Sequence, residues 1–284
     1  MKNDSELIRK SANEIVNVIN KIGLHATSLP KSKEAFAIDV VLIDLLKRIM
    51  VNINAFNIIL IENTKHNNAL NTIPMSLCLR TASIDCLTAS YLLCIHTDDL
   101  TFINELHVMS LDYARYLKKI HEIKRDYEHS VSSTKEFNDW FEKFRIKHAK
   151  YYNFKNNEWI LKSADELRSG SNSNFLEWLT KRKYKGKLTE DLKFEYINES
   201  NKDLAVFYIF FRYFSQHQHY GFANRGFIED NTNEDFIQFE LMLSCVPYLL
   251  KLIALVIDKK IDVINLFKKL DAYSEQIFQK HNQN

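Results

Sequence analysis

The stretch LAVFYIFFRYFSQHQHYG, residues 204–221, decides the fold class that this sequence predicts. It begins as an almost unbroken apolar and aromatic run, and Arg212, Ser215 and His219 enter within its last two turns. An α-helix has about 3.6 residues per turn, so residues at offsets of zero, three and seven lie on one face, and these three side chains form a single polar stripe. His217, at an offset of five, lies outside this stripe. Because polar groups in a protein interior cost free energy unless they are paired, this stripe predicts either a structural network or a functional site.

The rest of the chain is poor in residues that break helices. Among 284 residues there are only 5 Gly and 3 Pro. Sheet-rich folds need more tight turns, and flexible linkers need more glycine, whereas helical bundles need little of either. The sequence therefore predicts an all-α fold, a bundle of about eight to ten helices with long central helices. We expect a single domain over residues 1–284.

Apolar periodicity and capping residues place the helices along the chain. We expect them at about residues 4–23, 33–64, 75–96, 100–128, 132–151, 156–168, 174–180, 189–200, 201–220, 233–257 and 258–281. The helix at 75–96 is rich in Ser, Cys and Ala, which predicts close approach of its neighbours and burial. Arg80 and Asp85 lie about 140° apart on it, so each needs a partner on another element, and the stripe at 212–219 is the candidate neighbour.

Bulk charge and cysteine usage exclude several classes of protein. Lys and Arg total 38 against 36 Asp and Glu, a formal charge of +2, so no strong global field attracts nucleic acid or acidic lipid. Cys78, Cys86 and Cys94 recur every eight residues and Cys245 lies far away, a spacing that predicts buried thiols rather than a metal site or a disulfide framework. We expect a reducing, cytoplasmic location.

Neither a membrane span nor a cofactor is predicted. The most apolar stretches, 37–61 and 241–257, are both interrupted by charged residues, which favours core helices of a soluble protein. Glycine is too scarce for a phosphate-binding loop, so kinase, NTPase and dinucleotide-binding functions are excluded and no cofactor is expected. His107, His121, His129 and His148 lack metal-ligand spacing, and we expect them on or beside polar helix faces.

The spacing Arg-x6-His, with Arg-x4-His also satisfied by His217, resembles the arginine-to-histidine signature of the HEPN superfamily. That all-helical group includes many RNA-cleaving toxins and antiphage proteins. A wider pattern, Trp178 with a basic segment, a short helix and then Phe-Arg-Tyr-Phe-Ser-x-x-x-His, is similar to a bacterial all-helical family of uncharacterised function. The resemblance covers about residues 75–220, with 1–74 and 233–284 as flanking helices. Arg212, Ser215 and His219 match that family's later helix and Arg80 its earlier arginine.

This resemblance implies a function and an assembly. In active HEPN proteins an RNA 2′-hydroxyl attacks the adjacent phosphate without a metal ion. Histidine can transfer the proton near neutral pH, and arginine can neutralise charge on the phosphate without losing its own proton. Since seven helical residues span about 10 Å, one helix does not easily assemble a compact site, and the resemblance implies a homodimer that completes it. Asp85 and His217 are supporting candidates, and a toxin or antiphage setting implies an antitoxin or defence partner of unknown identity.

The residues also leave two noncatalytic readings open. In one, the stripe binds a ligand or a partner protein without chemistry. In the other it is a buried structural network, with Arg212 paired to Asp85 or another acid, Ser215 bonded to the backbone and His219 capping a neighbouring carbonyl.

A basic run follows Trp178. Lys181, Arg182, Lys183, Lys185 and Lys187 surround Tyr184. Such a run can neutralise the phosphates of RNA or single-stranded DNA while the aromatic ring stacks on a base. The alternative is a solvated loop.

Overall fold

The computed structural model describes residues 2–30, 37–66, 72–96, 99–128, 131–155, 158–170, 172–182, 188–216 and 232–282. These residues form eleven helices and one two-stranded sheet. The predicted all-α fold class with long central helices is therefore confirmed, with slightly more helices than expected.

The chain divides into two compact units. Unit 1 consists of residues 1–96 and 190–284, and unit 2 consists of residues 97–189. The expected single domain, with its core at 75–220, stays a prediction about how the chain folds as a whole.

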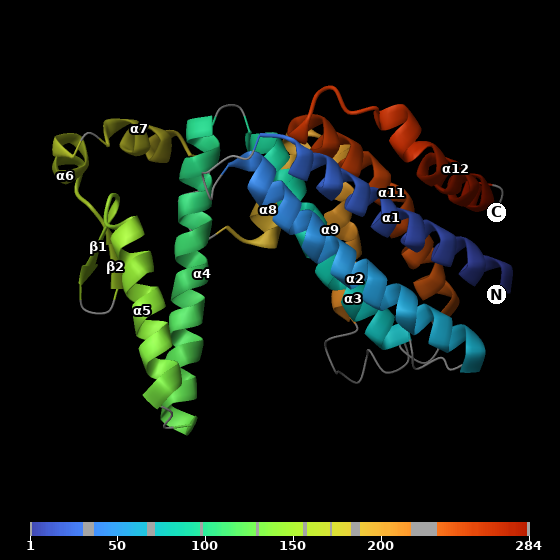
Figure 1. Ribbon diagram of the computed structural model, residues 1–284, viewed down its shortest axis with the longest axis horizontal. Coiled ribbons are helices and arrows are strands. Elements are labelled where there is room, and N and C mark those ends of the chain that lie inside the picture. Colours follow the sequence, from blue (N-terminus) through green and yellow to red (C-terminus); the bar gives the residue numbers. More distant parts are fainter. Residues whose placement is uncertain are drawn as a thin grey trace. The chain divides into compact units, whose positions relative to one another are not determined.

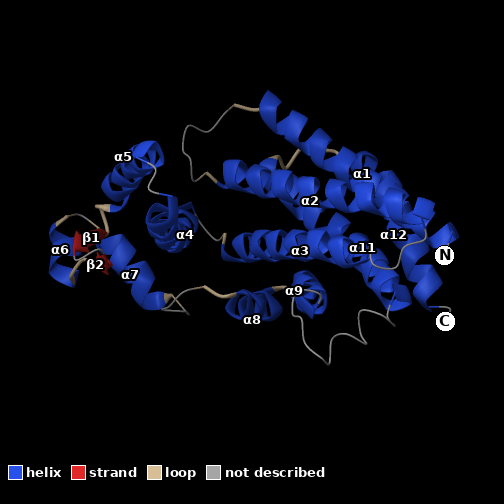
Figure 2. Ribbon diagram, turned by 90° about the horizontal axis from the view of Figure 1, so that it is seen from below, coloured by secondary structure: helices blue, strands red, loops and turns tan. Residues whose placement is uncertain are grey.

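Unit 1 is a helical bundle built around α3 (Thr72–Ile95). Its other helices are α1 (Lys2–Ser28), α2 (Ile38–His66), α8 (Glu190–Ser200), α9 (Lys202–Ser215), α11 (Thr232–Ile257) and α12 (Val263–Asn282). α3 packs against α2, α8, α9 and α11, and α1 packs against α2, α11 and α12. Figure 1 shows α1, α2 and α3 running alongside one another, and Figure 2 shows the same helices from below. Segments far apart in sequence therefore meet on α3.

The residues of α3 explain its central place. Fourteen of its 24 residues are buried, including Ser76, Ser83 and Ser90. The hydroxyls of Ser83 and Ser90 donate to carbonyls one turn earlier, at 2.8 Å each, so these two serines lie in the core with their hydrogen bonds made, whereas the Ser76 hydroxyl has no partner among the described residues. The expectation that this helix is buried is confirmed.

Two helices of unit 1, α3 and α11, are long and apolar enough to cross a membrane by length and composition alone. However, 61% and 56% of their most apolar windows are buried against the rest of the protein. Such burial is typical of core helices, as the sequence predicted for residues 241–257.

α1 continues past Gly23, where the sequence predicted its end, and runs to Ser28. A side chain at Gly23 would meet no atom within 4 Å, so glycine here costs helix propensity and serves no close approach. The last turn is fixed from outside, because the His25 Nε2 lies 2.7 Å from Oδ2 of Asp258, the residue that follows α11. A contact distant in sequence therefore extends the helix beyond its local stop signal.

Unit 2 contains α4 (Asp99–Glu128), α5 (Val131–His148), β1 (Tyr152–Lys155), β2 (Glu158–Leu161), α6 (Ala164–Ser169) and α7 (Ser173–Lys181). The predicted helix at 156–168 is wrong, because its first half is the strand β2, which pairs antiparallel with β1. Alternation of side chains explains the strand, since Trp159 is buried between exposed neighbours. α6 begins only after Ser163, which forms a capping box with Glu166.

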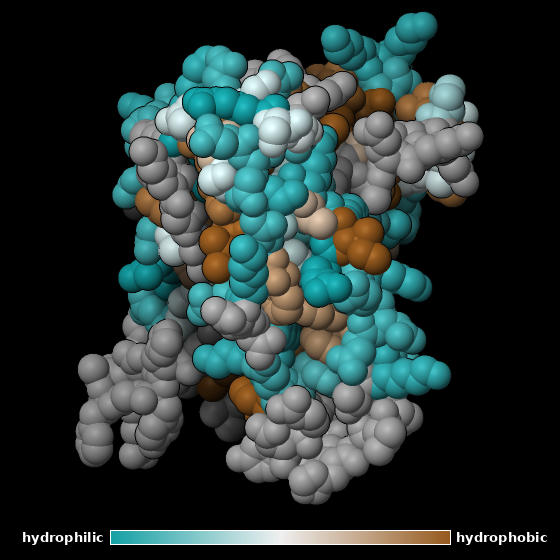
Figure 3. Space-filling view, turned by 90° about the vertical axis from the view of Figure 1, so that its left-hand side faces the viewer, coloured by the Kyte–Doolittle hydropathy of each residue, from teal (hydrophilic) through white to brown (hydrophobic). Residues whose placement is uncertain are grey.

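The core of unit 2 is aromatic. Tyr151, Tyr152, Trp159 and Phe175 are buried together, with two leucines and the partly buried rings of α5 around them. The Tyr151 and Phe175 rings stack with centroids 3.9 Å apart. On the face shown in Figure 3 the surface is mostly hydrophilic, with hydrophobic side chains in small separate groups. Packing of rings, rather than long apolar helices, holds this small unit together.

Candidate functional site

The C-terminal end of α9 presents the predicted arginine and serine. The helix begins after Asn201, whose side chain accepts a hydrogen bond from the Asp203 N–H. Its buried face carries Leu204, Ala205, Phe207, Phe210 and Phe214, a helical stripe packed toward α3 and α11. Arg212 lies off that face and is exposed, while Ser215 is half-buried. Within the described residues, the arginine of the stripe therefore faces outward, and the serine lies at the margin of the core.

Arg80 of α3 meets this end of α9. Its Nε donates a hydrogen bond of 3.0 Å to the Ser215 Oγ, and its guanidinium carbon lies 5.2 Å from the centre of the Phe211 ring. The sequence prediction that the stripe is a neighbour of Arg80 is confirmed for Ser215. Two residues separated by 135 positions are thus brought into direct contact.

The Ser215 hydroxyl both donates and accepts a hydrogen bond inside the protein. It donates its proton to the Phe211 carbonyl at 2.6 Å and accepts the bond from Arg80. In this arrangement the Ser215 hydroxyl holds the Arg80 side chain in position. A catalytic role of Ser215 stays a prediction from the sequence.

Among the described residues, neither Arg80 nor Arg212 forms a salt bridge with a carboxylate. Arg212 acts electrostatically on Tyr208, one turn earlier on α9, and the Tyr208 hydroxyl donates to Asp191 of α8. That hydrogen bond is the leading cause that raises the pKa of Tyr208. Two guanidinium groups lie close to one helix end without a salt bridge to any described carboxylate, an arrangement that can receive an anion.

His217 and His219 lie outside the described residues, which stop at 216 and resume at 232. The predicted extension of the helix to Tyr220 falls there too. Their part in the candidate site stays a prediction from the sequence.

Asp85 has a different partner from the one that the buried-network reading gave it. Its Oδ1 pairs with the Arg48 guanidinium of α2 at 2.7 Å, whereas Arg212 is exposed on α9. Burial raises the pKa of Asp85 to about 6 against the opposing effects of Arg48 and Lys193. The buried Lys193 of α8 donates to Thr88 at 3.1 Å, so α2, α3 and α8 meet in one polar cluster.

The basic run is divided between the surface and the interior. The amino group of Lys181 is exposed and pairs with Glu177 one turn earlier on α7 at 2.6 Å. Arg182 is buried and makes two hydrogen bonds to the Glu105 carboxylate of α4, at 2.9 and 2.6 Å. Binding a phosphate through Arg182 would leave the buried Glu105 without its charge partner. Lys183, Lys185 and Lys187 lie outside the described residues.

Two histidines that the sequence placed at polar helix faces are packed in the core of unit 2. The rings of His107 and His148 meet edge to face with centroids 5.3 Å apart, and His148 is fully buried. Burial, together with nearby lysines, lowers the pKa of each histidine to about 4. Their separation by 41 residues hid the pair from sequence analysis, although Phe144, four residues before His148, was a sign that this helix face is apolar.

No group of three or more His, Cys, Asp or Glu side chains that could hold a metal ion occurs in the described part of the chain. The four cysteines are free thiols; Cys86 is buried and the other three are half-buried. Burial raises the pKa of Cys94 and of Cys245 to about 11, which makes them weak nucleophiles. The reading of these residues as packed thiols fits this environment.

Comparison of the chain with protein-family models, with curated proteins and with solved structures finds no match in any of the three.

Proposed function

We propose that this chain is a cytoplasmic RNA-binding protein that cleaves RNA without a metal ion at the end of α9. In this proposal Arg80 and Arg212 bind the phosphate, Ser215 holds Arg80 in place, and His219 transfers the proton between the 2′-hydroxyl and the leaving oxygen. The observation that carries the proposal is the 3.0 Å hydrogen bond between Arg80 and Ser215, which joins the two arginine-bearing helices. The HEPN-like spacing supplies the reaction type and the toxin or antiphage setting.

A second copy of the chain completes the site in this proposal. Arg212 and His219 are seven residues apart, about 10 Å along a helix, and helical side chains lean toward the N-terminus. His219 of one protomer and Arg212 of its partner can reach one phosphate where a single helix cannot. The proposed active form is therefore a homodimer.

The contacts of Ser215 also favour a second function. Because both of its hydrogen-bonding roles are filled inside the protein, the Arg80–Ser215 contact also suits a purely structural joint between α3 and α9. In that case the exposed Arg212 belongs to a noncatalytic surface that binds a ligand or a partner protein.

A metal-free cleavage assay distinguishes the two functions. Purified protein is incubated with mixed RNA in EDTA, and the ends of the products are analysed. We expect wild type to leave 2′,3′-cyclic phosphate ends, and His219→Ala to cleave about 10²–10⁴-fold more slowly, the usual loss for a general acid–base residue. Arg212→Ala and Arg80→Gln should weaken both RNA binding and cleavage.

The matched control is Arg168→Ala, which removes an exposed arginine of unit 2 that pairs with the neighbouring Asp165. It should leave cleavage unchanged. Background-level cleavage by wild type and by every variant would contradict catalysis. RNA binding that falls in Arg212→Ala without any cleavage by wild type would support the noncatalytic function.

A further inference from the structure

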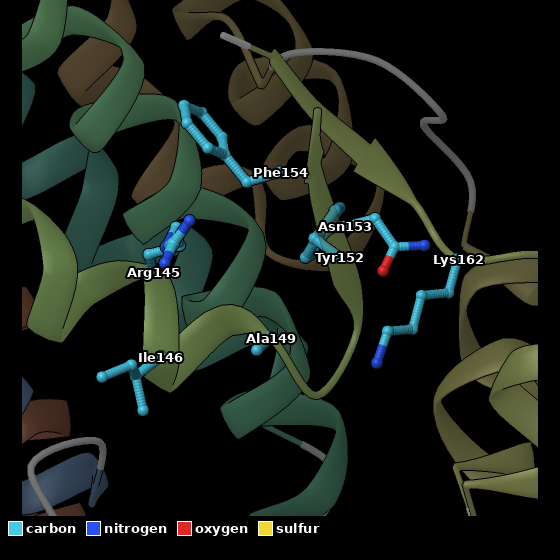
Figure 4. Close-up of a pocket in the computed structure, with 7 residues that line it drawn as sticks. All are labelled: Arg145, Ile146, Ala149, Tyr152, Asn153, Phe154 and Lys162. Carbon is cyan, nitrogen blue, oxygen red and sulfur yellow. The ribbon is translucent and has the colours of Figure 1, made fainter. Parts of the chain in front are cut away.

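A pocket of about 280 Å³ opens beside the hairpin of unit 2. Arg145 and Ile146 of α5 line one side of it together with Ala149, which follows the helix, β1 contributes residues 152–154, and Lys162 lies on the opposite side (Figure 4). Polar, cationic and apolar groups thus converge on one hollow.

In the described part of the chain, one edge of β1 has no strand beside it, because β1 pairs there with β2 alone. The register sets Tyr151 opposite Lys162, and the Lys162 N–H donates to the Tyr151 carbonyl at 3.1 Å. Hydrogen-bonded and non-hydrogen-bonded pairs alternate along antiparallel strands, so Tyr152 and Phe154 occupy non-hydrogen-bonded pairs. Their N–H and C=O groups therefore point away from β2, toward the free edge.

These four backbone groups have no hydrogen-bond partner among the described residues. Tyr152 is buried and Phe154 is half-buried, and both line the pocket. Backbone groups in such a setting are normally paired, and an unpaired strand edge is a template for another strand. The edge of β1 thus offers two donors and two acceptors at the two-residue spacing of an extended chain.

The surroundings of this edge are positively charged. Residues 142–166 contain four carboxylates, of which Glu142 bonds Arg145 and Glu166 bonds Asn153, and six cations, which are Lys143, Arg145, Lys147, Lys150, Lys155 and Lys162. At the pocket itself, one nitrogen of Arg145 bonds to Glu142 at 2.6 Å. The Lys162 amino group pairs with no carboxylate in the described part of the chain. An occupant with negative charge is favoured.

We propose that this pocket binds an extended acidic segment of a partner protein, which adds as a third strand to the free edge of β1. The backbone of the segment pairs with Tyr152 and Phe154, and its carboxylates meet Arg145 and Lys162. Strand addition of this kind takes affinity from main-chain hydrogen bonds and specificity from side-chain contacts.

The chemistry of the edge favours a peptide over a nucleotide. Donors and acceptors alternate along β1, so a phosphate bound there would face two carbonyl oxygens as well as two N–H groups. The proposal uses no residue of α9 and does not depend on RNA cleavage.

The test uses the full chain and a synthetic seven-residue peptide that alternates glutamate and valine, followed by amide NMR. We expect the peptide to shift the Tyr152 and Phe154 amides and to protect them from hydrogen exchange. The same peptide N-methylated at alternate residues should bind about tenfold more weakly, as expected for the loss of one or two hydrogen bonds. Lys162→Gln and added salt should also weaken binding, and a lysine–valine peptide should not bind.

A pair of variants isolates the strand edge. Phe154→Ala and Phe154→Pro both lose the ring, but only proline also removes the outward N–H, which makes no bond to β2. With unchanged circular dichroism, Phe154→Ala should keep most of the peptide affinity and Phe154→Pro should lose about tenfold of it. Equal affinity of the two variants, no binding of the glutamate–valine peptide, equal binding of its N-methylated form, or binding of an oligouridine probe instead would each overturn the proposal.

Discussion

The two units of this protein differ in the partners of their buried ionisable side chains. In unit 1 the buried Asp85, Lys193 and Glu240 each have a partner on another helix, and Glu240 bonds both Lys280 and His281 of α12. These contacts join helices that are far apart in sequence. Charge in unit 1 is therefore part of how the bundle is connected.

In the described part of the chain, unit 1 also has buried polar atoms without a hydrogen bond, such as the Ser76 hydroxyl and Asp85 Oδ2, but its ionisable side chains have a partner through another atom. Unit 2 combines one buried ion pair with a buried histidine that has no hydrogen bond at all among the described residues. Glu105 and Arg182 are paired, but both ring nitrogens of His148, both amide atoms of Asn104 and the indole nitrogen of Trp159 have no hydrogen-bond partner among the described residues. The aromatic core offers His148 stacking on Phe144, at 4.1 Å between ring centres, in place of a hydrogen bond. Because of this difference, we expect the stability of the two units to respond differently to the removal of a charged side chain and to a change of pH.

The largest effect is expected from Arg182→Ala. The variant leaves the Glu105 carboxylate buried without its cation, which typically costs about 3–5 kcal/mol. In hydrogen exchange, the amides of unit 2 should therefore exchange faster than in wild type, while the amides of unit 1 should keep their wild-type protection. Lys181→Ala, which removes the exposed neighbour, should change stability by no more than about 0.5 kcal/mol. If Arg182→Ala and Lys181→Ala destabilise unit 2 by similar amounts, the structural importance of the buried ion pair is contradicted.

Acid should loosen unit 2 selectively. A histidine in the unfolded chain takes up a proton near pH 6.5, whereas the folded His107 and His148 do so only near pH 4. The stability that these neutral rings contribute is full above pH 6.5 and is lost as the pH falls to about 4. Since one unit of pKa corresponds to about 1.4 kcal/mol, the buried His148 contributes on the order of 3 kcal/mol.

The check is near-UV circular dichroism and hydrogen exchange between pH 7.5 and 4. His148→Phe, which keeps an aromatic ring on Phe144, should flatten the acid response of unit 2. An acid transition of the same size in this variant, or one that is confined to unit 1, would contradict the assignment.

In unit 1, the stability contribution of Asp85 changes with pH in the opposite direction to that of the two histidines. Burial raises the pKa of Asp85 to about 6 from the 3.8 of an unperturbed aspartate, so its stability contribution is present below pH 3.8 and is lost as the pH rises to about 6. Its partner Arg48 is 64% exposed and tolerates the loss of the pair. Asp85→Asn should therefore stabilise unit 1 by about 1 kcal/mol at pH 7 and leave it unchanged at pH 3.5. Thermal unfolding at the two pH values measures this, and clear destabilisation at pH 7 would contradict it.

The smallest effect is expected from Ser215→Ala. It removes the bond that α9 receives from Arg80, which should cost about 0.5–1.5 kcal/mol. Ser200→Ala is the matched control, because the Ser200 hydroxyl also bonds a carbonyl four residues earlier, at 2.9 Å, and lies on the exposed end of α8. If the two variants unfold at the same temperature, the contact between α3 and α9 contributes nothing measurable.

Sequence patterns predicted most of this fold because most of it is local. Scarce glycine and proline, helical apolar stripes and the small residues of α3 are all visible along the chain, and they led to the correct fold class and to a buried α3. The hairpin was missed because four-residue strands carry a weak periodic signal, and a buried Trp159 fits a helix equally well.

The candidate site was predictable only in part. Helical spacing grouped Arg212 with Ser215, and the need of Arg80 for a partner pointed to α9. Periodicity did not reveal that Asp85 pairs with Arg48 or that Arg182 turns inward to Glu105, because both are contacts between elements distant in sequence. The same holds for the pair of buried histidines.

The most direct test of the central proposal, that the end of α9 cleaves RNA, is the ratio of initial cleavage rates of wild type and His219→Ala in EDTA. We predict a ratio of about 100 or more, with 2′,3′-cyclic ends formed by wild type. A ratio of one, measured with proteins that unfold at the same temperature, would contradict the proposal.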